Sequence, residues 1–272
     1  MRKIVFDIHD LQEIVPVFNN KFLAFWGRKL IKWLDFEKVN QIHSDHCHLQ
    51  GSDFTSAILS DPIMNVKYNL HNKEILDSLP EGAFITVSNH PIGSLDGIIL
   101  IDIFASRRKE FCVMVNEILE RISALAGNFI LVQPKTDDAI KSNVNTGGVR
   151  ATLGWLKAGH PIGFFPSGAI SFKGKNKQIK DRPWAHTVIR LIRKANVPVY
   201  PVYFACRNSR FFYWLGKISW KIRTFRIPTE TFNKRGQTFD IYIRQPICPQ
   251  TIQQYTDDAE LADFLYHATY NS

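Results

Sequence analysis

The order of apolar and polar positions divides this chain into two parts. Across residues 10–35, apolar side chains recur every three or four positions, which predicts a helix with one apolar face and with Pro16 near its start. From residue 80 onward, short apolar runs alternate with segments that carry a helical apolar face. This alternation predicts an α/β fold, in which a mixed, largely parallel sheet is flanked by helices.

The lengths of the runs place the elements of the second part. We expect strands at residues 83–88, 111–115, 129–132, 162–165, 199–204 and 239–243. We expect helices between and after them, at residues 97–108, 147–158, 183–195 and 257–268. The chain is thus divided into a helical N-terminal lobe, 1–79, and an α/β domain, 80–272, which together form one compact unit. The lobe could lie on a membrane or cover the sheet.

A polar segment within the lobe, His43 to His48, has His or Cys at four of its six positions. Structural zinc sites usually take paired ligands from two separated segments, and no second cluster of this kind follows in the sequence. We therefore interpret the segment as a loop between helices and expect no metal site.

Charge and hydropathy narrow the class of protein. The chain has 34 Lys and Arg against 25 Asp and Glu, a net charge of +9, and 45% hydrophobic residues. A mean hydropathy of -0.14 and the lack of an apolar run of eighteen residues exclude a polytopic membrane protein. The positive balance suits a nucleic acid or an anionic membrane as partner, or a basic surface with no partner.

The densest positive segment is 207–226, with six Lys or Arg, six aromatic residues and no Asp or Glu. Aromatic rings favour the lipid headgroup layer, and cations are attracted to anionic lipid. We predict that the segment binds membranes through Arg210, Phe211, Phe212, Trp214, Lys217, Trp220, Lys221 and Arg223. Two alternatives stay open: a single-stranded nucleic acid site, and a basic loop whose aromatic rings fill the core.

The candidate chemistry lies in the segment NHPIGSLDG, from Asn89 to Gly97, between an expected strand and an expected helix. Open α/β sheets place their sites at the carboxyl ends of strands. His90 could take a proton from a hydroxyl group if Asp96 orients its ring. The two side chains can meet only if the turn between them folds back, because six residues of regular helix would point them apart. The alternative is that Asp96 only caps the helix.

This segment resembles the first signature block of the lysophospholipid/glycerophospholipid acyltransferase superfamily. It is most similar to the bacterial haemolysin-like branch, which includes acyltransferases of lyso-ornithine and lyso-glycine lipids. In the wider superfamily four residues separate the His and the Asp, whereas here five do, as in that branch. The resemblance implies that His90 is the general base and that Asp96 orients it.

Three further segments resemble the later blocks of this superfamily in the same order. Gly127 to Gln133 is similar to the second block, with Gln133 where Arg is usual. Phe165 to Ser171 is similar to the third block, FPEGTRS, with Ser167 for Glu and Ile170 for Arg, and 197–202 is similar to the fourth. The resemblance implies a substrate-binding set of Asn89, Gly93, Ser94, Gln133, Phe165, Pro166, Ser167, Gly168 and Lys173.

The resemblance implies an O-acyltransferase that is peripheral to the membrane, on the cytoplasmic face of the inner membrane. Its substrates would be acyl-CoA or acyl carrier protein and a lyso-lipid. The missing arginines favour a lyso-aminolipid over a glycerol phosphate, because phosphate needs cationic partners. The oxyanion would be stabilised by backbone N–H groups of the turn 91–93 or of Gly168. No cofactor, nucleic acid or obligate protein partner is expected. The alternative is an inactive lipid-binding or nucleic-acid-binding protein on the same fold.

Overall fold

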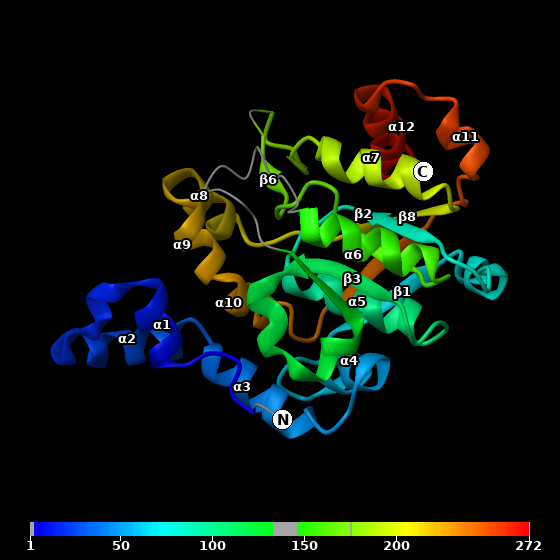
Figure 1. Cartoon of the computed structure of the whole chain (residues 1–272). Helices are drawn as coiled ribbons and strands as arrows, with labels where there is room; N and C mark the ends of the chain where they lie inside the picture. Colours follow the sequence, from blue (N-terminus) through cyan, green and yellow to red (C-terminus); the bar gives the residue numbers. More distant parts are fainter. Residues whose placement is uncertain (1–2, 133–145, 175, 272) are drawn as a thin grey trace.

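A seven-stranded sheet forms the centre of the molecule (Figure 1), in a computed structural model that describes residues 3–132, 146–174 and 176–271. The strand order is β1-β9-β8-β2-β5-β3-β4. Neighbouring strands are parallel except for β8 and β9, which are antiparallel. The mixed, largely parallel sheet predicted from the sequence is therefore confirmed.

The six expected strands are all present, with ends within two residues of their predicted positions. They are β2 (Ile85–Ser88), β3 (Cys112–Asn116), β4 (Phe129–Val132), β5 (Ile162–Phe164), β8 (Val199–Ala205) and β9 (Thr238–Ile243). Three short strands were not expected: β1 (Lys67–His71) and the antiparallel hairpin of β6 (Phe172–Lys173) and β7 (Ile179–Lys180). The sequence analysis expected a helical segment over residues 1–79. This is corrected, because β1 lies in that segment and pairs with β9 at the edge of the main sheet.

Helices cover both faces of the sheet. One face packs against α4 (Gly51–Ser60), α5 (Ser94–Ala105) and α10 (Ile227–Phe232), and the other against α6 (Thr146–Lys157), α7 (His186–Ala195) and α12 (Asp258–Tyr270). α5 is apolar on nearly all sides, because it is enclosed between the sheet and α4. A short helix, α11 (Pro249–Gln253), precedes α12. The predicted helices at 97–108, 147–158, 183–195 and 257–268 correspond to α5, α6, α7 and α12.

The N-terminal helices differ from the prediction of one helix over 10–35. The chain forms α1 (Ile8–Ile14), a 3₁₀ turn (Pro16–Asn19) and α2 (Lys21–Trp33). Proline at the first position of the 3₁₀ turn cannot continue α1, and Asn20 then caps α2 by accepting the N–H of Phe22. The break lies at Pro16 itself, so this proline ends a helix where the sequence analysis placed it near a start.

The segment 43–48 is also not the loop that was expected. Its first four residues form the last turn of α3 (Phe36–His46). His43 is buried against Phe54, and His46 pairs with Asp61 at 2.8 Å. These contacts give two of the histidines structural partners. Within the described ranges, no group of three or more His, Cys, Asp or Glu side chains is placed to hold a metal ion.

Candidate active site

The candidate site forms where β2 ends and α5 begins. β2 is buried on both faces between β5 and β8, so its carboxyl end is fixed at the middle of the sheet. The turn that follows bends sharply at Gly93, whose φ is +111°. An added Cβ there would lie 2.7 Å from the Ile170 side chain, so both the backbone angle and the packing require glycine. This bend brings the start of α5 back toward His90.

His90 and Asp96 meet because of this bend. The Nδ1 atom of His90 lies 3.0 Å from Oδ2 of Asp96, with the His90 side chain 19% exposed and Asp96 fully buried. The Nδ1–H direction is not aligned on the oxygen, so this is a close polar contact rather than an aligned hydrogen bond. Asp96 also accepts the N–H groups of Ile92 and Gly93, each at 2.9 Å. It therefore both stabilises the helix start and faces the histidine.

The His90 ring stacks on a second aromatic ring. Phe165, which follows β5, stacks on it with ring centroids 4.2 Å apart. Phe165 was predicted to bind substrate, and the structure places it directly beside the candidate base. The stacking limits rotation of the imidazole, so it keeps Nδ1 close to Asp96.

The backbone of His90 is held on both sides by residues that the sequence analysis did not name as site residues. Its carbonyl accepts the N–H of Ser171 at 2.8 Å, and its own N–H donates to Oδ1 of Asp181 at 3.3 Å. Ser171 Oγ donates to the same oxygen at 2.5 Å. Burial raises the pKa of the Asp181 carboxyl, while its hydrogen bonds to Ser171 and His90 lower it in part. The sequence feature that could have pointed to Asp181 is its position as the single acidic residue within the basic stretch 173–182.

Asn89 does not have the substrate-binding role that was expected. It is 3% exposed, and its side-chain amide donates to the Phe204 carbonyl at 3.0 Å and accepts the Phe204 N–H at 2.8 Å. Both polar groups of Asn89 are thus used to join the end of β2 to β8. The buried side-chain amide of Asn89 therefore positions the turn.

The other substrate-binding candidates are placed as follows. Ser94 Oγ lies 2.6 Å from Oγ1 of Thr231. Ser167 is buried, and its hydroxyl donates to the Ala169 carbonyl. Pro166 is also buried, and its carbonyl accepts the Ala185 N–H. Ser167 and Pro166 therefore have partners within the protein, and their substrate-binding roles stay predictions. Lys173 lies on β6, partly exposed. Gln133 is outside the described residues.

The expected oxyanion donors are corrected too. The N–H groups of Ile92 and Gly93 are taken by Asp96, and the Gly168 N–H donates to the Phe165 carbonyl at 2.9 Å. Pro91 has no N–H. Each donor proposed from the sequence therefore already has a partner within the protein.

The turn that carries His90 is also joined to the segment 207–226. Asn208 donates from its side chain to the carbonyls of Pro91 and Ile92, and its backbone N–H donates to the Tyr213 hydroxyl. Ser209 caps the next helix and bonds through its N–H and hydroxyl to the fully buried Glu230. These bonds fix α8 (Arg210–Ile218) directly beside the turn that carries His90.

The segment 207–226 forms α8 and α9 (Trp220–Phe225) rather than a loop. Phe211, Trp214 and Trp220 are exposed, as are Arg210 and Lys217. Phe212 is fully buried and Arg223 is 7% exposed, so these two are corrected: neither can contact a membrane surface. The side chain of Lys221 is outside the described part. The exposed aromatic side chains therefore lie on one side of α8 and the buried ones on the other.

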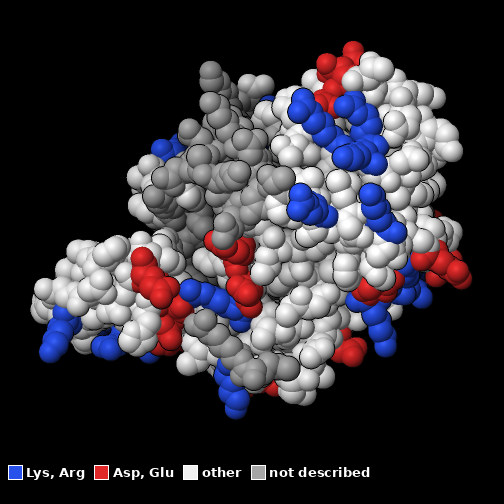
Figure 2. Space-filling view, viewed as in Figure 1, with Lys and Arg blue, Asp and Glu red and all other residues white. Residues whose placement is uncertain are grey.

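Positive charge is not confined to this segment. On the face drawn in Figure 2, Lys and Arg side chains gather over the α6–α7 side and along the edge of the N-terminal helices, with acidic and uncharged surface between them. No helix in the described ranges has the length and apolar character needed to cross a bilayer.

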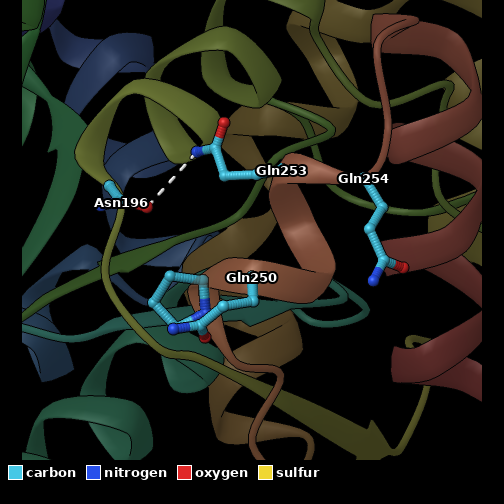
Figure 3. Close-up of a pocket in the computed structure, with 5 residues that line it drawn as sticks. Asn196, Gln250, Gln253 and Gln254 are labelled. Atoms are coloured by element: carbon cyan, nitrogen blue, oxygen red, sulfur yellow. Dashed lines mark hydrogen bonds between the residues drawn. The ribbon is translucent and has the colours of Figure 1, made fainter.

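A polar pocket lies away from His90, lined by Asn196, Pro249, Gln250, Gln253 and Gln254 (Figure 3). Gln253 donates from its side chain to the Arg193 carbonyl and to Asn196. The pocket adjoins the amino end of β8, whereas His90 follows the carboxyl end of its parallel neighbour β2. Its lining holds amides and a proline and no titratable side chain, so it offers no acid or base.

Comparison with known proteins agrees with this geometry. Residues 9–272 match a family model described as acyltransferase. A lyso-glycine lipid O-acyltransferase of Phocaeicola vulgatus is 27% identical over 96% of this chain and 94% of its own length. A lyso-glycine lipid O-acyltransferase of Bacteroides thetaiotaomicron is 26% identical over 92% of this chain and 89% of its own length.

A solved structure shares the fold. The 1-acyl-sn-glycerophosphate acyltransferase PlsC from Thermotoga maritima superimposes with a TM-score of 0.50 and 16% identity, over 99% of this chain and 95% of that one. The family match spans nearly the whole chain, and it includes the turn that brings His90 to Asp96. The chain belongs to the acyltransferase family.

Proposed function

We propose that this protein is a peripheral membrane O-acyltransferase that moves a fatty acyl group from acyl-CoA or acyl carrier protein to the hydroxyl of a lyso-aminolipid. The observation that carries the proposal is the pairing of a partly exposed His90 with a fully buried Asp96 at the carboxyl end of β2. The two related lyso-glycine lipid O-acyltransferases support a glycine-headed acceptor.

The placement of Asp96 determines which nitrogen of His90 acts. A carboxylate beside Nδ1 favours the tautomer with its proton on that atom, which leaves Nε2 free to accept a proton. Nε2 takes the proton of the acceptor hydroxyl as the oxygen attacks the acyl thioester. His90 then returns that proton to the leaving thiolate, and the positive charge on the ring is stabilised by Asp96 in between.

The exposed aromatic face supports work at a membrane. Phe211 and Trp214 stack on α8 with centroids 5.5 Å apart, and Arg226 lies over Phe211 at 4.7 Å and over Trp33 of α2 at 5.6 Å. α2 adds the exposed aromatic residues Phe22, Phe25 and Trp26 together with Lys21, Arg28 and Lys32. These contacts join α2 and α8 into one surface, which we call the aromatic face, with cations among its rings.

This face is coupled to the base by the bonds of Asn208 to Pro91 and Ile92. A lipid acceptor enters from the bilayer, so a membrane-binding helix that is fixed to the catalytic turn would place His90 close to the acceptor hydroxyl. The same bonds would prevent the turn from moving independently of the membrane-bound helix.

The test uses purified protein with vesicles that contain either lyso-glycine lipid or lysophosphatidic acid. Each is offered labelled acyl-CoA and, separately, labelled acyl carrier protein, and the products are identified by mass spectrometry. We expect an O-acylated glycine lipid with at least one donor. As a matched control, an N-acylglycine without the hydroxyl should take no label. Transfer to lysophosphatidic acid alone, or to neither acceptor, would contradict the proposal.

A further inference from the structure

Arg223 is a buried cation to which the reaction described above gives no role. Its side chain extends from α9 and is 7% exposed, and its Nε atom has no hydrogen-bond partner. Within the described residues, no carboxylate lies at salt-bridge distance from its guanidinium group. An unpaired buried charge is unfavourable, so a protein usually provides such a charge with an anion.

The surrounding residues are built to hold this arginine in place. Its guanidinium carbon lies 5.3 Å from the centre of the Phe212 ring, a cation–π contact with a fully buried aromatic residue. On α8, Gly216 makes room for it, since an added Cβ would lie 2.8 Å from the Arg223 Cδ atom. The packing therefore fixes the position of the guanidinium group, and its charge is left without an acidic partner in the described part of the chain.

A second cation lies in the same region. Arg182 follows β7, whose Ile179 packs against the cluster of Ile170, Phe212 and Tyr213, and Arg223 lies over Phe212 of that cluster. The positive charge of Arg182 also acts together with burial to lower the pKa of the Arg223 guanidinium. Arg182 follows Asp181, whose carboxylate accepts the backbone N–H of His90. Two like charges near each other are unfavourable unless a negative group lies with them.

Both cations lie close to the catalytic turn. Phe212, beneath Arg223, packs with Ile170, and Ile170 fills the space beside Gly93. Arg182 is adjacent in sequence to a residue that contacts His90 directly. Ile170 and Asp181 therefore connect the two arginines to the turn that carries His90.

We propose that Arg182 and Arg223 form a binding site for the carboxylate of the acceptor lipid, an inference that rests on the proposed acceptor class. A glycine joined to a fatty chain through its nitrogen keeps its carboxylate free. Guanidinium groups bind carboxylates through paired charge-assisted hydrogen bonds. Such a site would replace the cationic side chains that the second and third sequence blocks lack, and it would hold the lipid head while the hydroxyl faces His90.

The phosphates of the acyl donor are the other anions that this site could receive. The test separates the two sources by direct binding, measured by calorimetry on the full chain without turnover. The probes are N-decanoylglycine, its methyl ester, and coenzyme A. The variants are Arg223→Gln, Arg182→Gln and, as a matched control, Arg235→Gln, which changes an exposed arginine beyond α10.

We expect the wild type and Arg235→Gln to bind N-decanoylglycine about 10-fold or more tightly than the ester. Both Arg223→Gln and Arg182→Gln should reduce this preference to within about twofold, with coenzyme A binding unchanged. If Arg223→Gln fails to fold, Arg182→Gln, which changes a partly exposed residue, decides the question.

Equal binding of acid and ester by the wild type, or a preference that survives in both variants, would overturn the inference. A loss confined to coenzyme A would assign the site to the donor and overturn the carboxylate assignment. A wild type that prefers the acid but transfers no acyl group would contradict the proposed function while leaving this site in place.

Discussion

The Nδ1 atom of His90 lies 3.0 Å from Oδ2 of Asp96, and that same oxygen accepts the backbone N–H groups of Ile92 and Gly93. One carboxylate oxygen therefore stabilises the start of α5 and faces the candidate base. Asp96 therefore has the contacts that both interpretations drawn from the sequence require, those of a helix cap and those of a partner of His90.

Replacing Asp96 with asparagine separates these two roles. Asparagine can still accept the two N–H groups, but it carries no charge to stabilise a protonated His90. We expect Asp96→Asn to fold and to lose about 10²–10⁴-fold in kcat. The measurement is steady-state turnover on the acceptor identified above, with thermal unfolding recorded in parallel.

Asp102 on the same helix provides the matched control. Its carboxylate accepts hydroxyl groups of Thr55, Ser56 and Tyr68 and has no contact with His90. Asp102→Asn should lower stability while the folded enzyme keeps its kcat. Full activity in Asp96→Asn would leave Asp96 with the capping role alone.

Gly93 sets the bend that joins His90 to Asp96. Alanine at this position would be strained at φ +111° and would lie 2.7 Å from Ile170 Cδ1. We expect Gly93→Ala to lower the free energy of unfolding by about 1–3 kcal/mol and to reduce kcat as well. Gly82→Ala is the control, because an added Cβ there meets nothing within 4 Å. Equal stability of the two variants, by urea unfolding, would contradict this account of the turn.

The aromatic face should bind anionic vesicles. Arg210 and Lys217 are exposed on α8, and each cation near anionic lipid contributes about 1 kcal/mol. We expect the double change of both to Gln to weaken co-sedimentation with anionic vesicles by about 10- to 30-fold at low salt. Changing Trp214 to Ala should weaken binding at high salt too, because insertion of the ring is not screened.

The control for this prediction changes Lys157 and Lys194 to Gln, two exposed cations on α6 and α7. That variant should bind as the wild type does, although it loses the same charge. Equal weakening by both double variants would mean that net charge, and not the aromatic face, attracts the protein to lipid.

Asp181 should make stability depend on pH. Because burial raises its carboxyl pKa, the folded protein holds a proton there at pH values where the unfolded chain has released it. The wild type should then lose free energy of unfolding, relative to Asp181→Asn, as pH rises from about 4, the ordinary pKa of an aspartic acid, toward neutral pH. Urea unfolding of both proteins across this range is the measurement. A constant difference between them would show that Asp181 has the same pKa folded and unfolded.

The sequence was sufficient for the strands of the sheet interior. These strands are continuous apolar runs, because helices cover both faces, and such runs are visible without any partner. β1 was not predicted, although Lys67–His71 alternates polar and apolar residues, because this alternation covers only five residues with two apolar ones. The segment becomes a strand by pairing with β9, from the far end of the chain.

The site was predictable to a similar degree. His90 and Asp96 could be named because they lie in one short segment. Their side chains can meet only if the turn between them folds back, and Gly93 permits this with its φ of +111°. Asp181 could not be named, because its contact with His90 joins residues 91 positions apart. The structural role of Asn89 could not be foreseen either, because its buried bonds to Phe204 depend on the neighbouring strand β8. The sequence analysis therefore assigned Asn89 to substrate binding.

The most direct test of the account is the turnover of His90→Ala on the confirmed lyso-lipid. Its circular dichroism and thermal unfolding should match those of the wild type. The hydrogen bonds of residue 90 to Ser171 and Asp181 use backbone atoms, which alanine keeps. We predict that kcat falls by about 10²–10⁴-fold. A folded His90→Ala protein with near wild-type turnover would contradict the assignment of His90 as the general base.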